Sequence, residues 1–130
     1  MLQFLGKNIN SKYDLLVVKA KVSDFIKPLK FGKIDSEKFI DSVFELIRKL
    51  VFNQTDAHIY LNGCKRERKK GVEIYIYNKS ATMEKAQQIL NSNYDMTGES
   101  IILDKSFFDS FELRQDPKLG TEVHIIKLLK

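Results

Sequence analysis

An amphipathic segment between Phe39 and Val51 constrains the fold more than any other part of this chain. Its apolar residues recur every three or four positions, which is the period of an α-helix that turns one face toward a core. Glu45 and Lys49 fall outside this stripe, one turn apart, and the simplest interpretation is a solvent-exposed pair worth about 0.2–0.5 kcal/mol to the helix. The apolar positions are Phe39, Ile40, Val43, Phe44, Leu46, Ile47, Leu50 and Val51.

The rest of the chain alternates between segments with strand patterns and segments with helical patterns. Ser11 is the expected N-cap of a first helix that ends near Leu29, and Asp35 or Ser36 is the expected N-cap of the amphipathic helix. The basic segment Gly63–Gly71 is expected to be the loop of a hairpin. The other predicted elements are a helix over Met83–Leu90 and strands over Leu2–Leu5, Ala57–Leu61, Val72–Tyr77, Phe111–Arg114 and Thr121–Leu129.

Length and composition predict a single domain over residues 1–130. With 130 residues and 43% hydrophobic content, the chain can bury one core. Cys64 is the only cysteine, so it cannot form an internal disulfide, which favours a reducing compartment, and we expect its thiol to be inert. The N-terminus does not resemble a secretory signal, and no segment approaches the roughly 20 apolar residues of a membrane span. We therefore expect a soluble, cytoplasmic protein.

Four short segments are similar to the motifs of one family. Glu45–Lys49 resembles a Glu-Leu-x-x-Asn helix motif, with lysine in place of the asparagine. Asn78–Thr82 stands where the family has Asp-x-Gly-x-Gly, and Gly98–Ile101 where it has Gly-x-Gly-Leu. Gly120–Thr121 matches the Gly-Thr of its closing strand. From about residue 14 to residue 130, the chain thus resembles the switch-kinase and anti-sigma-factor branch of the GHKL ATPase superfamily.

The resemblance implies an α+β fold of the histidine-kinase-like ATPase type. This fold is a two-layer α/β sandwich with helices packed on one face of a mixed, mostly antiparallel sheet. It also implies a helix over Lys105–Phe111, and it aligns Asn91–Gly98 with the family's nucleotide lid. In the family the motif glutamate is a general base and the asparagine holds magnesium. The implied site therefore consists of Glu45 as a vestigial base and Lys49, Asn78, Gly98 and Thr121 as vestigial nucleotide-binding residues.

The departures from the motifs can be judged by their chemistry. Lys49 carries an ammonium, which has no lone pair to offer a metal, although it could contact phosphate. Asn78 keeps an acceptor oxygen for an adenine amino group but loses the charge of the family's aspartate. Ser80 and Thr82 replace glycines whose missing Cβ lets backbone approach a ligand. We expect impaired magnesium–ATP chemistry, with no magnesium and no other metal site, and we leave binding of ATP or ADP open.

The resemblance and these departures together favour a regulatory protein over an enzyme. The implied function is partner switching, in which the chain binds a STAS-domain antagonist or a related signalling protein. The alternative is a divergent ATP-dependent serine/threonine protein kinase, an anti-sigma factor in which Glu45 remains the base and Lys49 contacts phosphate. The oligomeric state is left open.

A second alternative, nucleic-acid binding, comes from the basic run Lys65–Lys70 and the net charge of +5. Clustered lysine and arginine can neutralise phosphates, but a recognition helix or stacking aromatics usually accompany them. Tyr75 and Tyr77 share a strand face, and we interpret them as packing residues. His58 and His124 have no metal-ligand pattern around them. A solvated hairpin loop is therefore the favoured interpretation of this run.

Overall fold

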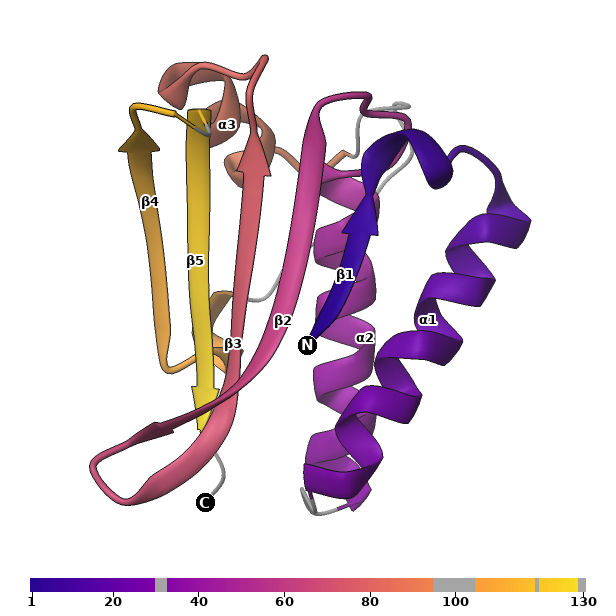
Figure 1. Ribbon diagram of the computed structural model, residues 1–130, viewed down its shortest axis with the longest axis vertical. Coiled ribbons are helices and arrows are strands. Elements are labelled where there is room, and N and C mark those ends of the chain that lie inside the picture. Colours follow the sequence, from indigo (N-terminus) through magenta and orange to yellow (C-terminus); the bar gives the residue numbers. More distant parts are fainter. Residues whose placement is uncertain (30–32, 95–104, 119, 129–130) are drawn as a thin grey trace.

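The computed structural model describes residues 1–29, 33–94, 105–118 and 120–128. Over these residues the chain is an α+β protein with three α-helices and a five-stranded sheet, an arrangement compatible with a two-layer α/β sandwich (Figure 1). The elements run in the order β1 (Leu2–Leu5), α1 (Lys12–Ile26), α2 (Lys33–Leu50), β2 (Ala57–Arg66), β3 (Lys69–Asn78), α3 (Met83–Asn91), β4 (Ser110–Asp116) and β5 (Gly120–Leu128).

The strands lie in the order β1-β2-β3-β5-β4, and each neighbouring pair is antiparallel. The expectation of a mixed sheet is therefore wrong for the described strands. The helices explain the direction of β2, because α1 and α2 pack side by side as a helical hairpin and return the chain to the end of the sheet where β1 finishes (Figure 1). A tight turn then reverses the chain between β2 and β3, and β4 pairs antiparallel with β5.

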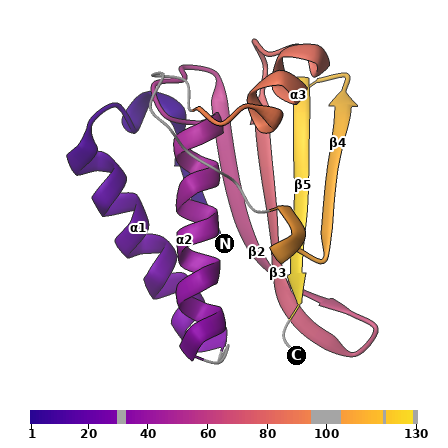
Figure 2. The same ribbon diagram turned by 180° about the vertical axis from the view of Figure 1, so that it is seen from behind.

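The core lies between α2 and one face of the sheet, with α1 packed against α2 (Figure 2). The predicted apolar stripe of α2 is confirmed, because most of its residues are buried and Ile40 and Phe44 are partly buried against the core. The sheet contributes the alternate residues that point toward the helices. These are Ala57, Ile59, Leu61, Val72, Ile74, Ile76, Val123 and Ile125.

The helix starts are only partly as predicted. Ser11 caps α1 as expected, since its hydroxyl accepts a hydrogen bond from the amide of Asp14 at 3.1 Å. The α2 backbone begins at Lys33, so the expected N-caps Asp35 and Ser36 lie inside the helix. Acidic and hydroxyl residues are also favourable within a first turn, so their presence alone does not fix the first helical residue.

The hairpin between β2 and β3 is much tighter than the expected loop over Gly63–Gly71. The strands continue to Arg66 and from Lys69, which are paired, and only Glu67 and Arg68 form the turn. Both turn residues have positive φ, at 50° and 71°, as a two-residue turn of type I′ requires. Polar composition suggested a loop, but the backbone ladder between two long strands extends regular structure through it.

The expected helix over Lys105–Phe111 is also wrong. A 3-10 turn, η3 (Lys105–Phe107), is followed at Ser110 by β4. This segment forms a strand rather than a helix because the amide of Asp109 donates to the carbonyl of Ile126 at 2.9 Å, and this bond starts a ladder that pairs β4 with β5. The predicted strands at the chain ends and in the hairpin are confirmed, with longer bounds for β2, β3 and β4. Helix α3 is confirmed as well.

Candidate functional site

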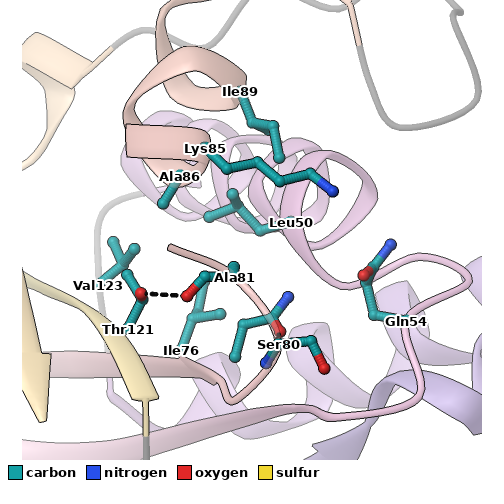
Figure 3. A pocket seen from close by; sticks show the side chains of 11 residues that line it. Leu50, Gln54, Ile76, Ser80, Ala81, Lys85, Ala86, Ile89, Thr121 and Val123 are labelled. Atoms are coloured by element: carbon teal, nitrogen blue, oxygen red, sulfur yellow. Dashed lines mark hydrogen bonds between the residues drawn. The ribbon is translucent and has the colours of Figure 1, made fainter. Parts of the chain in front are cut away.

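A small pocket lies where the end of α2, helix α3 and the adjoining ends of β3 and β5 meet (Figure 3). Its free volume is about 50 Å³. Apolar and polar side chains both line it, which is the composition of a site for a small, partly polar group. The lining residues are Leu50, Gln54, Ile76, Asn78, Ser80, Ala81, Lys85, Ala86, Ile89, Thr121 and Val123.

Asn78 and Thr121 come together in this pocket because they are directly opposite each other on β3 and β5. The buried Thr121 hydroxyl donates to the carbonyl of Ala81 at 2.6 Å (Figure 3). Its oxygen therefore keeps acceptor capacity toward the pocket. The Asn78 side-chain oxygen accepts from the amide of Ser80 at 3.1 Å, which closes a tight turn after β3.

The turn after β3 uses the residues that replace the family's glycines. The Ser80 hydroxyl donates to the carboxylate of Asp56 at 2.5 Å, and the amide of Lys79 donates to the Asp56 carbonyl at 3.3 Å. Thr82 is the N-cap of α3, where its hydroxyl accepts from the amide of Lys85 at 3.1 Å. Both replacements therefore fix the local backbone with their own side chains.

Lys49 does not lie on an exposed face. Its side chain is fully buried, at 0% exposure, and its ammonium donates to the carbonyl of Ser92. Ser92 is the C-cap of α3, so the ammonium sits at the negative end of that helix dipole. The interpretation of Glu45 and Lys49 as a solvent-exposed pair is therefore wrong. Spacing on α2 placed Lys49 outside the apolar stripe, but α3 and its C-cap Ser92 pack against that side of the helix.

The structure brings together only part of the site that the resemblance implies. Asn78 and Thr121 share the pocket, whereas Glu45 and Lys49 do not line it. Glu45 is half-buried on α2. Gly98, and with it most of the implied lid, lies outside the described residues. Lys85 was not predicted, and its place in the first turn of α3, three residues after the Thr82 N-cap, is the signal that could have found it.

The fit to a nucleotide and a metal can be tested on these residues. The pocket volume of about 50 Å³ is well below the roughly 300–1,000 Å³ of sites that enclose drug-sized ligands. At the position of the family's metal-holding asparagine, Lys49 presents an ammonium. Across the described segments, no three His, Cys, Asp or Glu side chains gather as a metal site would need. Among the described residues, Lys49 therefore supplies a cation where the resemblance implies a metal ligand.

A second group of polar and aromatic side chains lies on the opposite face of the sheet. Tyr75 stacks on His124 with ring centroids 4.3 Å apart, and Glu73 accepts from the Tyr75 hydroxyl at 3.1 Å. Burial, the bond to Glu73 and nearby carboxylates raise the pKa of Tyr75. Burial and then Glu122 raise the pKa of Tyr77. The alternation of aromatic residues along β2 and β3 was the signal for this group, and it was interpreted as packing alone.

Cys64 is half-buried on β2 beside this group. Burial and the nearby carboxylate of Glu73 raise the pKa of its thiol, against the opposing effect of Arg66. A raised pKa lowers the thiolate fraction, and the thiolate is the nucleophilic form. The expectation that Cys64 is chemically inert therefore has a physical basis.

No family model matches this chain, and no curated protein or solved structure is similar enough to it to count as a match. Among the helices that the structure describes, none has the length and apolar character to cross a bilayer. Function has to be inferred from the side chains themselves and from the resemblance of the four short motifs.

Proposed function

We propose that this chain is a cytoplasmic partner-switching regulator with the histidine-kinase-like ATPase fold. In this proposal it binds a STAS-domain antagonist or a related signalling protein, and it performs no ordinary magnesium–ATP chemistry. The observation that carries the loss of magnesium–ATP chemistry is the burial of Lys49, whose ammonium is bonded to the end of α3. The α+β architecture, with helices on one face of the sheet, is compatible with the proposed histidine-kinase-like ATPase fold.

Buried Lys49 argues against metal binding in two ways. Its positive charge repels a divalent cation, and it offers no lone pair while charged. It cannot swing aside without cost, because withdrawing it from Ser92 breaks a charge-assisted bond inside the protein. The lysine therefore has a structural use that competes with a role in phosphate binding.

The turn after β3 supports the same proposal. Glycines in the family's motif let backbone amides approach a nucleotide closely. Here Ser80 is bonded to Asp56, and Thr82 caps α3. Their side chains fill space that glycines would leave open. What the pocket retains is the acceptor pair Asn78 and Thr121, which is enough for the edge of a small heteroaromatic group but not for a triphosphate.

Titration calorimetry with ATP and ADP, each with and without magnesium, tests the loss of nucleotide chemistry. We expect no micromolar binding and no effect of magnesium. Lys49→Met is the matched variant, because methionine fills a similar volume without the charge. Magnesium-dependent ATP binding that Lys49→Met abolishes would favour the kinase alternative instead.

Direct binding assays test the partner. Purified STAS-domain proteins from the same genome are immobilised one at a time, and binding of this chain is measured with and without ATP. We expect one of them to bind with micromolar or tighter affinity and with no transfer of labelled phosphate from ATP. If none binds, the partner-switching proposal is wrong, and phosphate transfer to a serine of the STAS protein would establish the kinase.

A further inference from the structure

The face of the sheet that points away from the helices carries a continuous group of aromatic rings. Five rings come from three adjacent strands: His58 and Tyr60 from β2, Tyr75 and Tyr77 from β3, and His124 from β5. Ring centroids lie 6.3 Å apart for His58 and Tyr60, 5.9 Å for Tyr60 and Tyr77, 6.2 Å for Tyr75 and Tyr77, and 4.3 Å for Tyr75 and His124. We call these five residues the aromatic face.

Hydrogen bonds hold part of this face in place. One carboxylate oxygen of Glu73 accepts from the Tyr75 hydroxyl at 3.1 Å and from Arg66 at 3.1 Å, and it lies 3.2 Å from Nε2 of His124. Stacked rings with fixed orientations form a platform at little further entropic cost. In the described part of the chain, the helices pack on the other face of the sheet (Figure 2).

One end of the aromatic face opens into a pocket of about 240 Å³, lined by Asp56, His58, Tyr60, Tyr77 and Lys79. Three of the five lining residues present rings, and Lys79 adds a cation at the rim. Nδ1 of His58 is buried and has no hydrogen-bond partner among the described residues. The pocket therefore combines ring surfaces with the positive charge of Lys79, and this combination suits a nucleobase with its attached phosphate.

The other end of β2 and β3 is strongly basic. The hairpin tip Lys65–Lys70 is exposed, and it contains five lysine and arginine residues. Because the two strands continue into the tip, Arg66 and Lys69 face each other as a strand pair rather than in a separate loop. The basic tip is therefore an extension of the sheet that carries the aromatic face.

Two acidic groups on this face are paired with arginines. Glu73 is bonded to Arg66, and Glu112 is bonded to Arg114 on β4. Glu122 is only 8% exposed, opposite Tyr77 and Arg114 on the neighbouring strands. The carboxylate of Asp56 in the pocket accepts a hydrogen bond from the Ser80 hydroxyl. With a net charge of +5 for the chain, the exposed basic tip is the part of this surface that is complementary to a polyanion.

We propose that a single-stranded nucleic acid binds across this face of the sheet. Its bases stack on Tyr60, Tyr77 and the neighbouring rings, and its phosphates contact Lys79 and the basic tip Lys65–Lys70. Single strands are the natural ligand because their bases are free to stack on side chains, whereas duplex bases are stacked on each other. Sheets that bind RNA through two or three stacked bases use the same combination of rings and cations.

Fluorescence anisotropy with a labelled oligonucleotide of about 12 nucleotides, within the usual range of site sizes, tests this proposal on the full chain. We expect oligo-dT and oligo-U to bind, with affinity that falls as salt rises. Tyr60→Leu and Tyr77→Leu should each raise Kd by about 5- to 150-fold, the range for loss of one stacked base. Lys69→Glu should weaken binding and should lower the slope of log Kd against log salt concentration by about one.

Matched control variants distinguish the loss of a contact on the aromatic face or the basic tip from the effect of removing a tyrosine or a lysine elsewhere on the protein. Tyr13 is 74% exposed on α1, so Tyr13→Leu should leave Kd unchanged, as should Lys12→Glu on the same helix. Tyr60→Phe keeps the ring and should bind like the original protein, which distinguishes stacking from misfolding. Circular dichroism checks that each variant is folded.

Three outcomes would overturn the proposal. The first is absence of binding at about 50 mM salt, a low-salt condition that favours phosphate contacts. The second is an equal loss of affinity in Tyr60→Leu and Tyr13→Leu. The third is self-association of the chain in sedimentation experiments that Tyr77→Leu abolishes without any nucleic-acid binding, which would make the aromatic face a contact between two copies.

Discussion

Lys49 and Ser92 are joined by a hydrogen bond between an ammonium at the end of α2 and a backbone carbonyl at the end of α3. The lysine is fully buried, so this bond operates away from water, where hydrogen bonds to charged groups are strongest. It connects the long core helix to the short helix that walls the pocket. This bond therefore ties the C-terminal end of α3 to α2.

Replacing Lys49 should show how much this bond and the packing of its side chain contribute to stability. Lys49→Ala removes both the side-chain volume and the bond, so we expect the free energy of unfolding to fall by about 2–5 kcal/mol. Lys49→Met keeps most of the volume and should cost less, about 1 kcal/mol. Urea denaturation measures both. Equal losses in the two variants would contradict the importance of packing around the lysine stem.

Gly120 should not tolerate a side chain. Its φ is +88°, and a Cβ there would lie 2.5 Å from the carbonyl oxygen of Asn78 and 2.7 Å from Cα of Lys79. Gly120→Ala should lower the free energy of unfolding by about 1–3 kcal/mol. Gly63→Ala is the control, because a Cβ added there would meet nothing within 4 Å, and it should change stability by less than about 1 kcal/mol. A similar loss in both would contradict this account.

The Thr121 hydroxyl should matter through its bond to Ala81. Thr121→Val keeps the shape of the side chain but leaves the Ala81 carbonyl without this donor, at a cost of about 0.5–1.5 kcal/mol in thermal or urea unfolding. Thr55→Val, at an exposed position, should be nearly neutral. If the two substitutions cost the same, the pocket turn does not rely on this bond.

Substitutions in the hairpin turn are expected to increase the stability of the protein. Glu67 and Arg68 both adopt positive φ, which costs residues with a Cβ roughly 1–2 kcal/mol each. The double variant Glu67→Asn and Arg68→Gly has the preferred type I′ sequence and should raise the melting temperature. Lys65→Asn with Lys70→Gly introduces the same residues into the flanking strands, where they should destabilise. A turn variant that is less stable than the original would contradict the observed turn geometry.

Stability should fall at high pH through Tyr75 and Tyr77. The folded pKa of each is raised above its ordinary value, so the folded protein holds these protons more tightly than the unfolded chain does. The resulting stabilisation is complete below the unfolded pKa of about 10 and is lost as the pH rises through the folded values. Absorbance of tyrosinate against pH should show a late-titrating component.

Single substitutions assign that late component. Tyr75→Phe and Tyr77→Phe should each remove part of it and should flatten the decline of stability above a pH of about 10. If both variants titrate like the original protein, the raised pKa values belong elsewhere. Tyr75→Phe also loses the bond to Glu73, so its stability is compared at neutral pH first.

Periodicity predicted the elements whose residues have one buried face. The stripe of α2, the Ser11 cap of α1 and the alternating strands all follow from local patterns, and the structure confirms them. The helix expected over Lys105–Phe111 failed because pairing with β5 decides the conformation of that segment, and pairing is not visible in local sequence. The long polar arms of the hairpin were missed for the same reason.

The candidate site was predictable only where it follows from strand ends. The resemblance implies Asn78 and Thr121 together with Lys49 and Gly98, and strand register brings the pair Asn78 and Thr121 into one pocket. Lys49 was placed on an exposed face because a helix pattern reveals one buried stripe but not a second contact made by α3. The aromatic face could not be recognised from the alternating pattern alone, because the rings come together only when their strands pair as neighbours.

The β1–β2 ladder pairs Leu2 with Leu61, and both long helices lie between these two residues in the sequence. The two arms of the hairpin, by contrast, are joined by a two-residue turn. Local pairings close within microseconds, but distant ones must wait for the entropy of a large loop to be overcome. The first strand is therefore expected to dock last during folding. Until it does, the backbone groups of β2 along that edge are open to pairing with another chain, so the moment of greatest vulnerability to aggregation comes late in folding.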